Sequence, residues 1–527
     1  MKKIRNENKV FLVAVVAIII CILAFQYNIN FGINKNPPSV KWGKGLKISE
    51  AKVNTYPLII KEDKGYLVAI NNEDKVKIMK FNSAAVKLSE KEFKINSSII
   101  SNLNFIKNHE GNYIISYDSK KVSGSEENLI KLDENLNKIS EETINGVNES
   151  SQIDDKIIIR GYEDSIQVVN MQKNENLKVK ANKVIMSRGV KINDNNYLIV
   201  YLTQNGALNA FNYEDNKITS QKELFTFNLS PNQIIINSAL GTDGNKIYLI
   251  MCKKVKNNFQ TDKYVFDINK MSEFTYEKLR VPNIYDINDV KFVQNEDGKA
   301  LFLVGGSRDF GIKKTYTDVF EMYVKDNKVS IGSFLSKSSQ VTVFPALSKD
   351  IAIYCDYNPS KENHNVYIAS TNQDFKEKNN KVSSLERKLA FLDTLQGFMY
   401  SLTYLLIIGL KWIIPSAVIM CIISLFEYKI NVKWKKRIYI IASIVTFLIK
   451  AKTIQYTNYK VYAYYLPKAL MSPILGVLIN LMFSLVCYSY GYYKYKDDLE
   501  AMPVVKFIPY VLLDSIFTLL VFAPYML

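Results

Sequence analysis

The chain has 527 residues, room for two or three domains, and a formal net charge of +17. Its lysines are scattered among Asn, Ile and Tyr and are densest beside apolar segments, so we expect no nucleic-acid partner despite the charge. The five cysteines include no C-x-x-C pair, so the sequence supports neither a zinc knuckle nor a redox pair. The only histidines, His109 and His364, lie in turn-like contexts, so we expect exposed turn residues and not catalytic ones.

The N-terminal residues 1–28 have the pattern of a cytoplasmic tail followed by a signal-anchor helix. Sixteen apolar residues, Val10 to Phe25, reach about 24 Å as a helix, just enough for a short membrane span. No A-x-A follows them, and the bulky Ile20 before Cys21 argues against a lipoprotein site. The basic flank predicts that the chain starts in the cytoplasm; it consists of Lys2, Lys3, Arg5 and Lys9.

Residues 29–39, which include N-K-N-P-P, are predicted to be a linker, and residues 40–380 then repeat one pattern. A turn rich in Asp, Asn and Gly precedes a short run of β-branched and aromatic residues, and a second run and turn follow. The first runs start 40 to 53 residues apart, at Tyr66, Tyr113, Ile157, Tyr197, Ile247, Ala300 and Ile351. Turn-bounded pairs of such runs are hairpins, and this period without helices is typical of propeller blades.

Seven copies predict seven blades, because a single blade cannot bury both of its faces. A strand near Lys41–Ile48 is expected to complete the last blade. A β-sandwich pair or an open array is the alternative. The pattern resembles generic β-propeller ectodomain repeats, without the WD dipeptide of the WD40 class. We interpret turns such as Asp243-Gly244 as hairpin turns, because a calcium loop needs alternating carboxylates that N-E-D-G at residues 295–298 lacks.

Residues 383–527 are predicted to be a helical membrane domain with four spans. Ser383 and Glu386 form the pattern of a capping box, and the first span should end near Phe426. A basic loop that includes Lys433–Arg437 follows, and further spans are expected at about 438–449, 469–490 and 505–525, with an outer loop over Lys450–Lys468. A hairpin tip at Lys411-Trp412 would turn the basic loop outward, so we reject it. The chain then spans five times and ends outside the cell.

Two charges lie inside the predicted spans, Lys411 and Asp514. Each costs about 2.5–3.5 kcal/mol near the centre of a bilayer, so each needs a partner. Their expected depths differ by about 9 Å, which a flexible lysine largely covers. We predict a structural Lys411–Asp514 ion pair; the alternative is that Asp514 is a proton or cation site.

The predicted fold class is mainly β: a seven-bladed β-propeller ectodomain plus one N-terminal and four C-terminal transmembrane helices. This predicts a multi-pass cell-membrane protein that presents the propeller outside the cytoplasm as a ligand- or protein-binding scaffold. Expected partners are the lipid bilayer and a membrane or extracytoplasmic protein. The alternatives are an accessory or regulatory subunit of a transport or signalling complex, and an extracytoplasmic carbohydrate-active enzyme.

We expect no catalytic residue, cofactor or metal site. The carboxylates that an enzyme could use are interpreted as turn residues; they are Asp118, Asp154, Asp155, Asp243 and Asp297. Cys252 and Cys355 occupy corresponding ends of different repeats, so no disulfide is expected between them.

Overall fold

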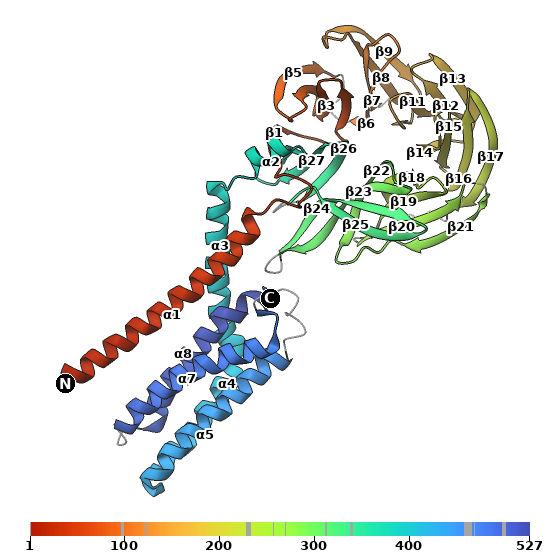
Figure 1. Ribbon diagram of the computed structural model, residues 1–527. Coiled ribbons are helices and arrows are strands. Elements are labelled where there is room, and N and C mark those ends of the chain that lie inside the picture. Colours follow the sequence, from red (N-terminus) through yellow and green to blue (C-terminus); the bar gives the residue numbers. More distant parts are fainter. Residues whose placement is uncertain are drawn as a thin grey trace. The chain divides into compact units, whose positions relative to one another are not determined.

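The computed structural model describes residues 2–95, 100–121, 124–227, 233–256, 258–268, 270–310, 314–337, 341–457, 466–467, 470–497 and 502–526. The chain forms two compact units (Figure 1). The propeller unit comprises Pro37–Asp309 and Thr315–Lys381. The N-terminal helix and the segment from Val382 onwards belong to the helical unit.

The propeller unit consists of seven four-stranded antiparallel sheets, which confirms the predicted fold class. The first strands of successive blades contact one another and line the centre of the ring. Blade 1 consists of β2 (Leu58–Glu62), β3 (Gly65–Asn72), β4 (Lys75–Asn82) and β5 (Lys87–Lys94). Blade 2 consists of β6 (Ile100–Lys107), β7 (Tyr113–Lys121), β8 (Gly124–Leu132) and β9 (Lys138–Asn145). Blade 3 consists of β10 (Glu149–Gln152), β11 (Ile157–Gly161), β12 (Ser165–Asn170) and β13 (Glu175–Lys180).

Blades 4 to 7 follow in chain order. They are β14 (Val184–Lys191), β15 (Asn196–Thr203), β16 (Ala207–Glu214) and β17 (Lys217–Thr226); β18 (Gln233–Thr242), β19 (Lys246–Val255), β20 (Asn258–Asp267) and β21 (Lys270–Lys278); β22 (Tyr285–Glu296), β23 (Lys299–Phe310), β24 (Lys314–Lys325) and β25 (Lys328–Phe334); and β26 (Thr342–Ser348), β27 (Ile351–Asn358) and β28 (Asn363–Ser370) with β1 (Leu46–Ala51).

Each predicted apolar run is the second strand of a blade, because both faces of that strand are covered by neighbouring blades. In β3, for example, every residue from Gly65 to Asn71 is buried. The apolar side chains of blades 1 and 2 form one cluster, and those of blades 3 and 4 form another. Burial on both faces therefore explains why these strands are continuous apolar runs and not alternating ones.

The two ends of the ring are joined within blade 7. The N-terminal strand β1 pairs antiparallel with β28, with Leu46 opposite Ile368 and Ala51 opposite His364. The prediction that an N-terminal strand completes the last blade is confirmed, although the strand starts later than Lys41. A closed ring of this kind excludes the open array and the sandwich pair.

The recurring Asp and Asn residues cap the turns between the first and second strands. The Asp243 carboxylate accepts hydrogen bonds from the backbone N–H groups of Asn245 and Lys246, at 2.9 and 2.8 Å. Gly244 has a φ of +98°, which a residue with a Cβ rarely adopts. Asn108 and Asp154 make the same turn in blades 2 and 3. The turn interpretation of Asp243-Gly244 is confirmed.

The helical unit contains five helices that are long and apolar enough to cross a membrane, found among the described residues. The helices and short helical turns of the chain are α1 (Lys2–Lys35), α2 (Gln373–Asn379, in the propeller unit), α3 (Ser384–Tyr404), η1 (Leu405–Gly409), α4 (Leu410–Leu425), η2 (Glu427–Lys429), α5 (Val432–Ala451), η3 (Lys452–Thr457), α7 (Pro473–Asp497), α8 (Pro503–Phe522) and η6 (Ala523–Tyr525).

The second long apolar helix begins and ends where the sequence predicts. Ser383 and Glu386 form the capping box, and the helical stretch continues through η1 and α4 to a cap at Phe426. Because Lys411 lies inside this continuous stretch, the rejected hairpin at Lys411-Trp412 is absent from the described residues.

Two predicted boundaries differ from the structure. Helix α1 continues to Lys35, into the segment predicted to be a linker, because the side chains of Asn30 and Asn34 bond to Thr394 and Asp393 of α3. Helix α5 and the following π turn reach Thr457, so residues 450–457 are helical where an outer loop was predicted. Residues 458–465 of that loop lie outside the described residues.

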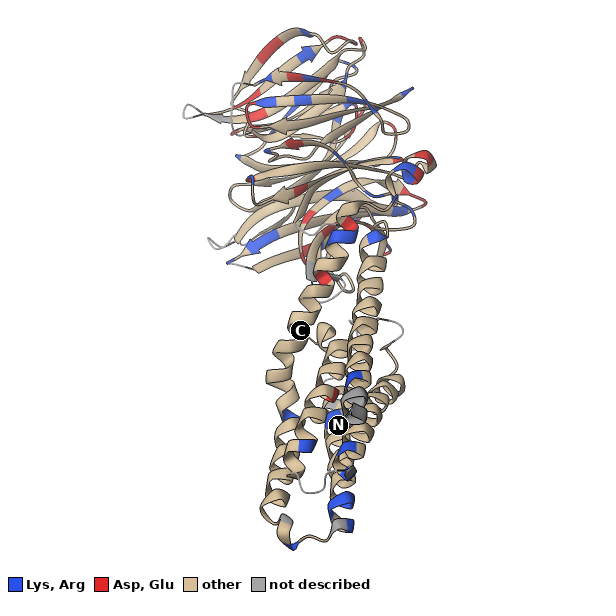
Figure 2. Ribbon diagram, turned by 90° about the vertical axis from the view of Figure 1, so that its left-hand side faces the viewer, with Lys and Arg blue, Asp and Glu red and all other residues tan. Residues whose placement is uncertain are grey.

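Contacts between the helices show which of their termini lie at the same end of the helical unit. Phe11 of α1 stacks on Tyr490 of α7 at a centroid distance of 3.7 Å, and Tyr439 of α5 stacks on Tyr495 at 5.4 Å. At the opposite end, the Tyr525 hydroxyl donates to Gln26 at 2.6 Å. The first end, called the basic end below, carries Lys9, Lys433, Lys435, Lys436, Arg437, Lys494 and Lys496 on the aligned helix termini. Lys and Arg segments gather there at the lower end of the helical unit in Figure 2.

Candidate functional sites

The helical unit contains a buried ion pair between Lys450 of α5 and Asp514 of α8. The Lys450 Nζ lies 2.6 Å from Oδ1 and 2.7 Å from Oδ2 of Asp514, and neither side chain is exposed. Ser484 and Tyr488 of α7 donate hydrogen bonds to the same carboxylate, at 3.2 and 3.0 Å. Thr518 also lies 3.1 Å from the ammonium. Three helices therefore supply the polar partners that a buried pair of charges needs.

The predicted partner of Asp514 is wrong. Lys411 is exposed, whereas Lys450 occupies the position beside the carboxylate. The error follows from the predicted end of the helix at residue 449, which placed Lys450 in an outer loop. Because α5 continues past this point, Lys450 lies on the same buried face as Thr446.

A sequence signal for this cluster exists on α7. Asn480, Ser484 and Tyr488 follow one another at four-residue spacing, so they share one face of the helix. All three are buried in the structure. A polar stripe of this kind in an apolar helix indicates a polar partner on a neighbouring helix, so it is a signal from which this cluster can be found.

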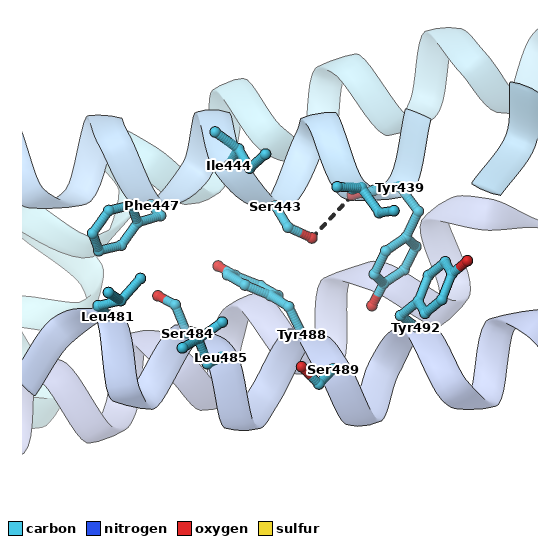
Figure 3. A pocket seen from close by; sticks show the side chains of 11 residues that line it. Tyr439, Ser443, Ile444, Phe447, Leu481, Ser484, Leu485, Tyr488, Ser489 and Tyr492 are labelled. Atoms are coloured by element: carbon cyan, nitrogen blue, oxygen red, sulfur yellow. Dashed lines mark hydrogen bonds between the residues drawn. The ribbon is translucent and has the colours of Figure 1, made fainter. Parts of the chain in front are cut away.

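An elongated groove with a volume of about 390 Å³ lies between α5 and α7, next to the ion pair. Ser484 and Tyr488 belong both to its wall and to the hydrogen-bond network of Asp514. Figure 3 shows the side chains of the two helices facing each other across it. Its lining consists of Tyr439, Ile440, Ser443, Ile444 and Phe447 of α5, and Leu481, Ser484, Leu485, Tyr488, Ser489 and Tyr492 of α7.

The propeller holds a second polar cluster, around Asp289 of β22. The Asp289 carboxylate accepts hydrogen bonds from the Tyr56 hydroxyl, from Asn237 Nδ2 at 2.7 Å and from the Phe344 N–H at 2.8 Å. Asp289, Asn237 and Phe344 belong to blades 6, 5 and 7, and Tyr56 directly precedes blade 1. Since first strands line the centre of the ring, this cluster joins neighbouring blades on the inner side of the ring.

Burial raises the pKa of Asp289 to about 7, although the Phe344 N–H and the nearby Lys291 act to lower it. The half-buried Lys291 lies 5.2 Å from the centroid of the Tyr56 ring, and desolvation lowers its pKa to about 8. The charge of this cluster therefore changes near neutral pH.

We expect the stability of the propeller to fall as the pH rises from about 4 to about 7. An unfolded aspartate titrates near pH 4, so between these values the folded state binds a proton that the unfolded state has lost. The fall is measured by chemical denaturation at pH 5 and pH 7, with hydrogen exchange of the propeller amides as the readout of unfolding. Asp289→Asn should reduce it; an undiminished fall in this variant would contradict the role of Asp289. Asp118, whose pKa burial also raises to about 7, should contribute in the same direction, whereas His364, whose pKa burial lowers, acts in the opposite direction.

The carboxylates that the sequence singles out are dispersed over the ring. Asp154 and Asp243 cap turns, and Asp297 lies in a turn with a φ of +52°. Asp155 is exposed in the turn before β11. The turn interpretation is wrong for Asp118, which is buried within β7 and accepts hydrogen bonds from the backbone N–H and the hydroxyl of Ser150, both at 2.6 Å.

The histidines and cysteines follow the predictions in part. His109 is exposed in a turn as expected, whereas His364 is a half-buried strand residue that pairs with Ala51, so the turn prediction for it is wrong. Cys252 and Cys355 are buried and free. Within the described ranges, no group of three or more His, Cys, Asp or Glu side chains is placed to hold a metal ion.

No protein-family model matches the chain, and no curated protein matches it. Solved structures are similar over the propeller. A structure of BBS1N in complex with ARL6DN has 11% identity and a TM-score of 0.41, and the match covers 64% of this chain and 99% of that one. The N-terminal domain of Nup159 has 10% identity and a TM-score of 0.37, with 63% and 96% covered.

The β-propeller domain of the Trilobed protease from Pyrococcus furiosus is also similar, with 12% identity and a TM-score of 0.35 over 62% of this chain and 99% of that one. At such identities the likeness concerns the fold alone. The number of blades and their closure rest on the strand order of this chain.

Proposed function

We propose that the chain is a multi-pass membrane protein that holds its seven-bladed propeller outside the cytoplasm as a protein-binding scaffold. The observation that carries this proposal is the combination, in one chain, of a closed ring of blades with five apolar helices of membrane-spanning length. Propellers display loops and strand ends from many blades around one ring, which suits the recognition of a partner protein.

The distribution of positive charge supports this orientation. Lys9, the cluster at Lys433–Arg437 and the pair Lys494 and Lys496 lie at the same end of the helical unit, because Phe11 stacks on Tyr490 and Tyr439 on Tyr495. Loops rich in Lys and Arg remain in the cytoplasm, so this end belongs inside. Tyr525 lies at the opposite end with Gln26, which places the C-terminal end of α8 outside in this proposal.

Cysteine labelling tests the orientation. Cys252 and Cys355 are buried and cannot report it, so we choose the exposed Ser360, in the turn before β28, and Tyr428, between α4 and α5. In a chain without its exposed native cysteines, a membrane-impermeant maleimide should label Ser360→Cys in intact cells. Tyr428→Cys should be labelled only after permeabilisation. The reverse pattern would overturn the proposed orientation.

One edge of blades 5 and 6 supports a role in binding. Large apolar and aromatic side chains are exposed where β18, β20 and β22 begin and β21 ends, on the side of the β19–β20 turn; they are Ile234, Ile236, Phe259, Tyr276 and Tyr285. Because the strands of each blade are antiparallel, these termini share one edge. Exposed apolar patches of this kind mark interaction surfaces.

We expect Ile234→Glu/Tyr276→Glu to reduce the amount of protein that co-purifies with the full-length chain from membranes by at least about tenfold, because buried glutamates at an interface lack partners. The control is Leu88→Glu, at an exposed position on β5 of blade 1. Quantitative mass spectrometry of the purified material measures the change. Equal recovery with the double variant and the control would show that this edge is not the binding surface.

A further inference from the structure

The groove between α5 and α7 has the length of one leaflet of a bilayer. Its lining residues run from Tyr439 to Phe447 on α5 and from Leu481 to Tyr492 on α7. At 1.5 Å per residue these stretches are about 12 and 17 Å long. The hydrocarbon core of a bilayer is about 30 Å thick, so the groove extends over about half of it, beginning at the basic end.

The walls combine an apolar track with hydroxyl groups. Ile440, Ile444 and Leu485 are 46%, 53% and 57% exposed, so the track is open to the surroundings of the helical unit. The Tyr439 side chain is 1% exposed, and its hydroxyl has no hydrogen-bond partner among the described residues. Figure 3 shows its ring directed from α5 towards α7. This hydroxyl lies against Gly491 of α7, which is not among the residues that line the groove.

Basic residues continue both walls towards the cytoplasmic end. Lys436 precedes Ile440 by four residues on α5, and Lys496 follows Tyr492 by four residues on α7, so helical periodicity places each on the groove face. Lys436 is half-buried and Lys496 is exposed. Neither forms an ion pair with a carboxylate of the described residues, whereas the nearby Lys494 lies over the rings of Tyr490 and Tyr493.

We propose that this groove binds an anionic phospholipid of the inner leaflet. One acyl chain lies along the track between α5 and α7, and the phosphate lies at the end marked by Lys436 and Lys496. An apolar groove of leaflet length that ends in two lysines, neither of them paired with a carboxylate of the described residues, fits this occupant better than an uncharged helix. This inference rests on the membrane-spanning orientation in the proposed function.

The test compares lipid retention by the full-length chain, purified in detergent with equal amounts of dioleoylphosphatidylglycerol and dioleoylphosphatidylcholine, by native mass spectrometry. The wild type should retain the anionic lipid at least about fivefold over the zwitterionic one, since a lysine near the membrane surface contributes about that factor. Ser443→Phe and Leu485→Trp, which fill the groove, should abolish retention of both. Lys436→Gln/Lys496→Gln should retain both lipids equally.

Two matched controls separate the groove from general effects. Val418→Phe enlarges an exposed side chain on α4, and Lys9→Gln/Lys429→Gln removes two charges from other segments at the cytoplasmic side; both should behave like the wild type. Leu485→Trp changes an exposed position, so it remains informative if Ser443→Phe does not fold.

Unchanged retention in the filled variants, an unchanged preference in the lysine variant, or a polypeptide bound in place of lipid would overturn the inference. A chain that does not sediment with membranes would overturn the proposed function instead.

Discussion

Replacing Lys450 by methionine should destabilise the helical unit by about 3–5 kcal/mol, because it leaves the Asp514 carboxylate buried without its counter-ion. Asp514→Asn should have a similar effect, since the ammonium of Lys450 then has no carboxylate. The measurement is the fraction of folded protein in mixed micelles with increasing dodecyl sulfate. In the double variant Lys450→Met/Asp514→Leu most of the loss should be recovered, since apolar replacements of a buried pair are often neutral.

Lys411→Met is the matched control for this experiment. It removes the same kind of charge from a helix of the same unit, but Lys411 is exposed and the carboxylate of Asp514 is already paired. We expect a change below about 0.5 kcal/mol, as at other surface positions. A larger loss of stability with Lys411→Met than with Lys450→Met would favour the Lys411–Asp514 ion pair that the sequence predicts. Normal folding of Asp514→Asn with loss of an ion-dependent activity would favour a proton or cation site.

Replacing Trp42 by alanine should destabilise the propeller by about 3–5 kcal/mol, the usual cost of deleting a fully buried aromatic side chain. Trp42 has no exposed surface and lies just before β1, where it packs against Leu303 of blade 6 and Ala369 of blade 7. Its indole N–H donates to Glu321 at 3.1 Å. The substitution removes both this hydrogen bond and the packing that joins the last two blades.

Hydrogen exchange of the β28 amides, together with chemical denaturation of the full-length chain, measures this loss. Val40→Ala provides the control two residues earlier, because Val40 is 96% exposed and contributes little packing. If Trp42→Ala leaves the exchange of β28 at the level of Val40→Ala, the closure of the ring does not depend on the tryptophan.

The turns at Asp154 and Asp243, the apolar runs and the capping box are local features, and their predictions are confirmed. The turn interpretation fails for Asp118, which is buried within β7. A strand buried on both faces requires a continuous apolar run, and a tight turn requires residues such as Gly244 with a φ of +98°. Both requirements concern a few consecutive residues. Seven repetitions of the pattern therefore predict seven blades without knowledge of their packing.

What the sequence by itself determined is thus the class and order of the elements: a ring of hairpins that an N-terminal strand closes, and five long apolar helices. Only the tertiary structure decided which distant side chains meet. Lys450 and Asp514 are 64 residues apart in the sequence, and Tyr56 and Asp289 are 233 residues apart. The reason is physical: local patterns specify helices, turns and strands, whereas the partner of a buried charge depends on which faces of separate elements pack together.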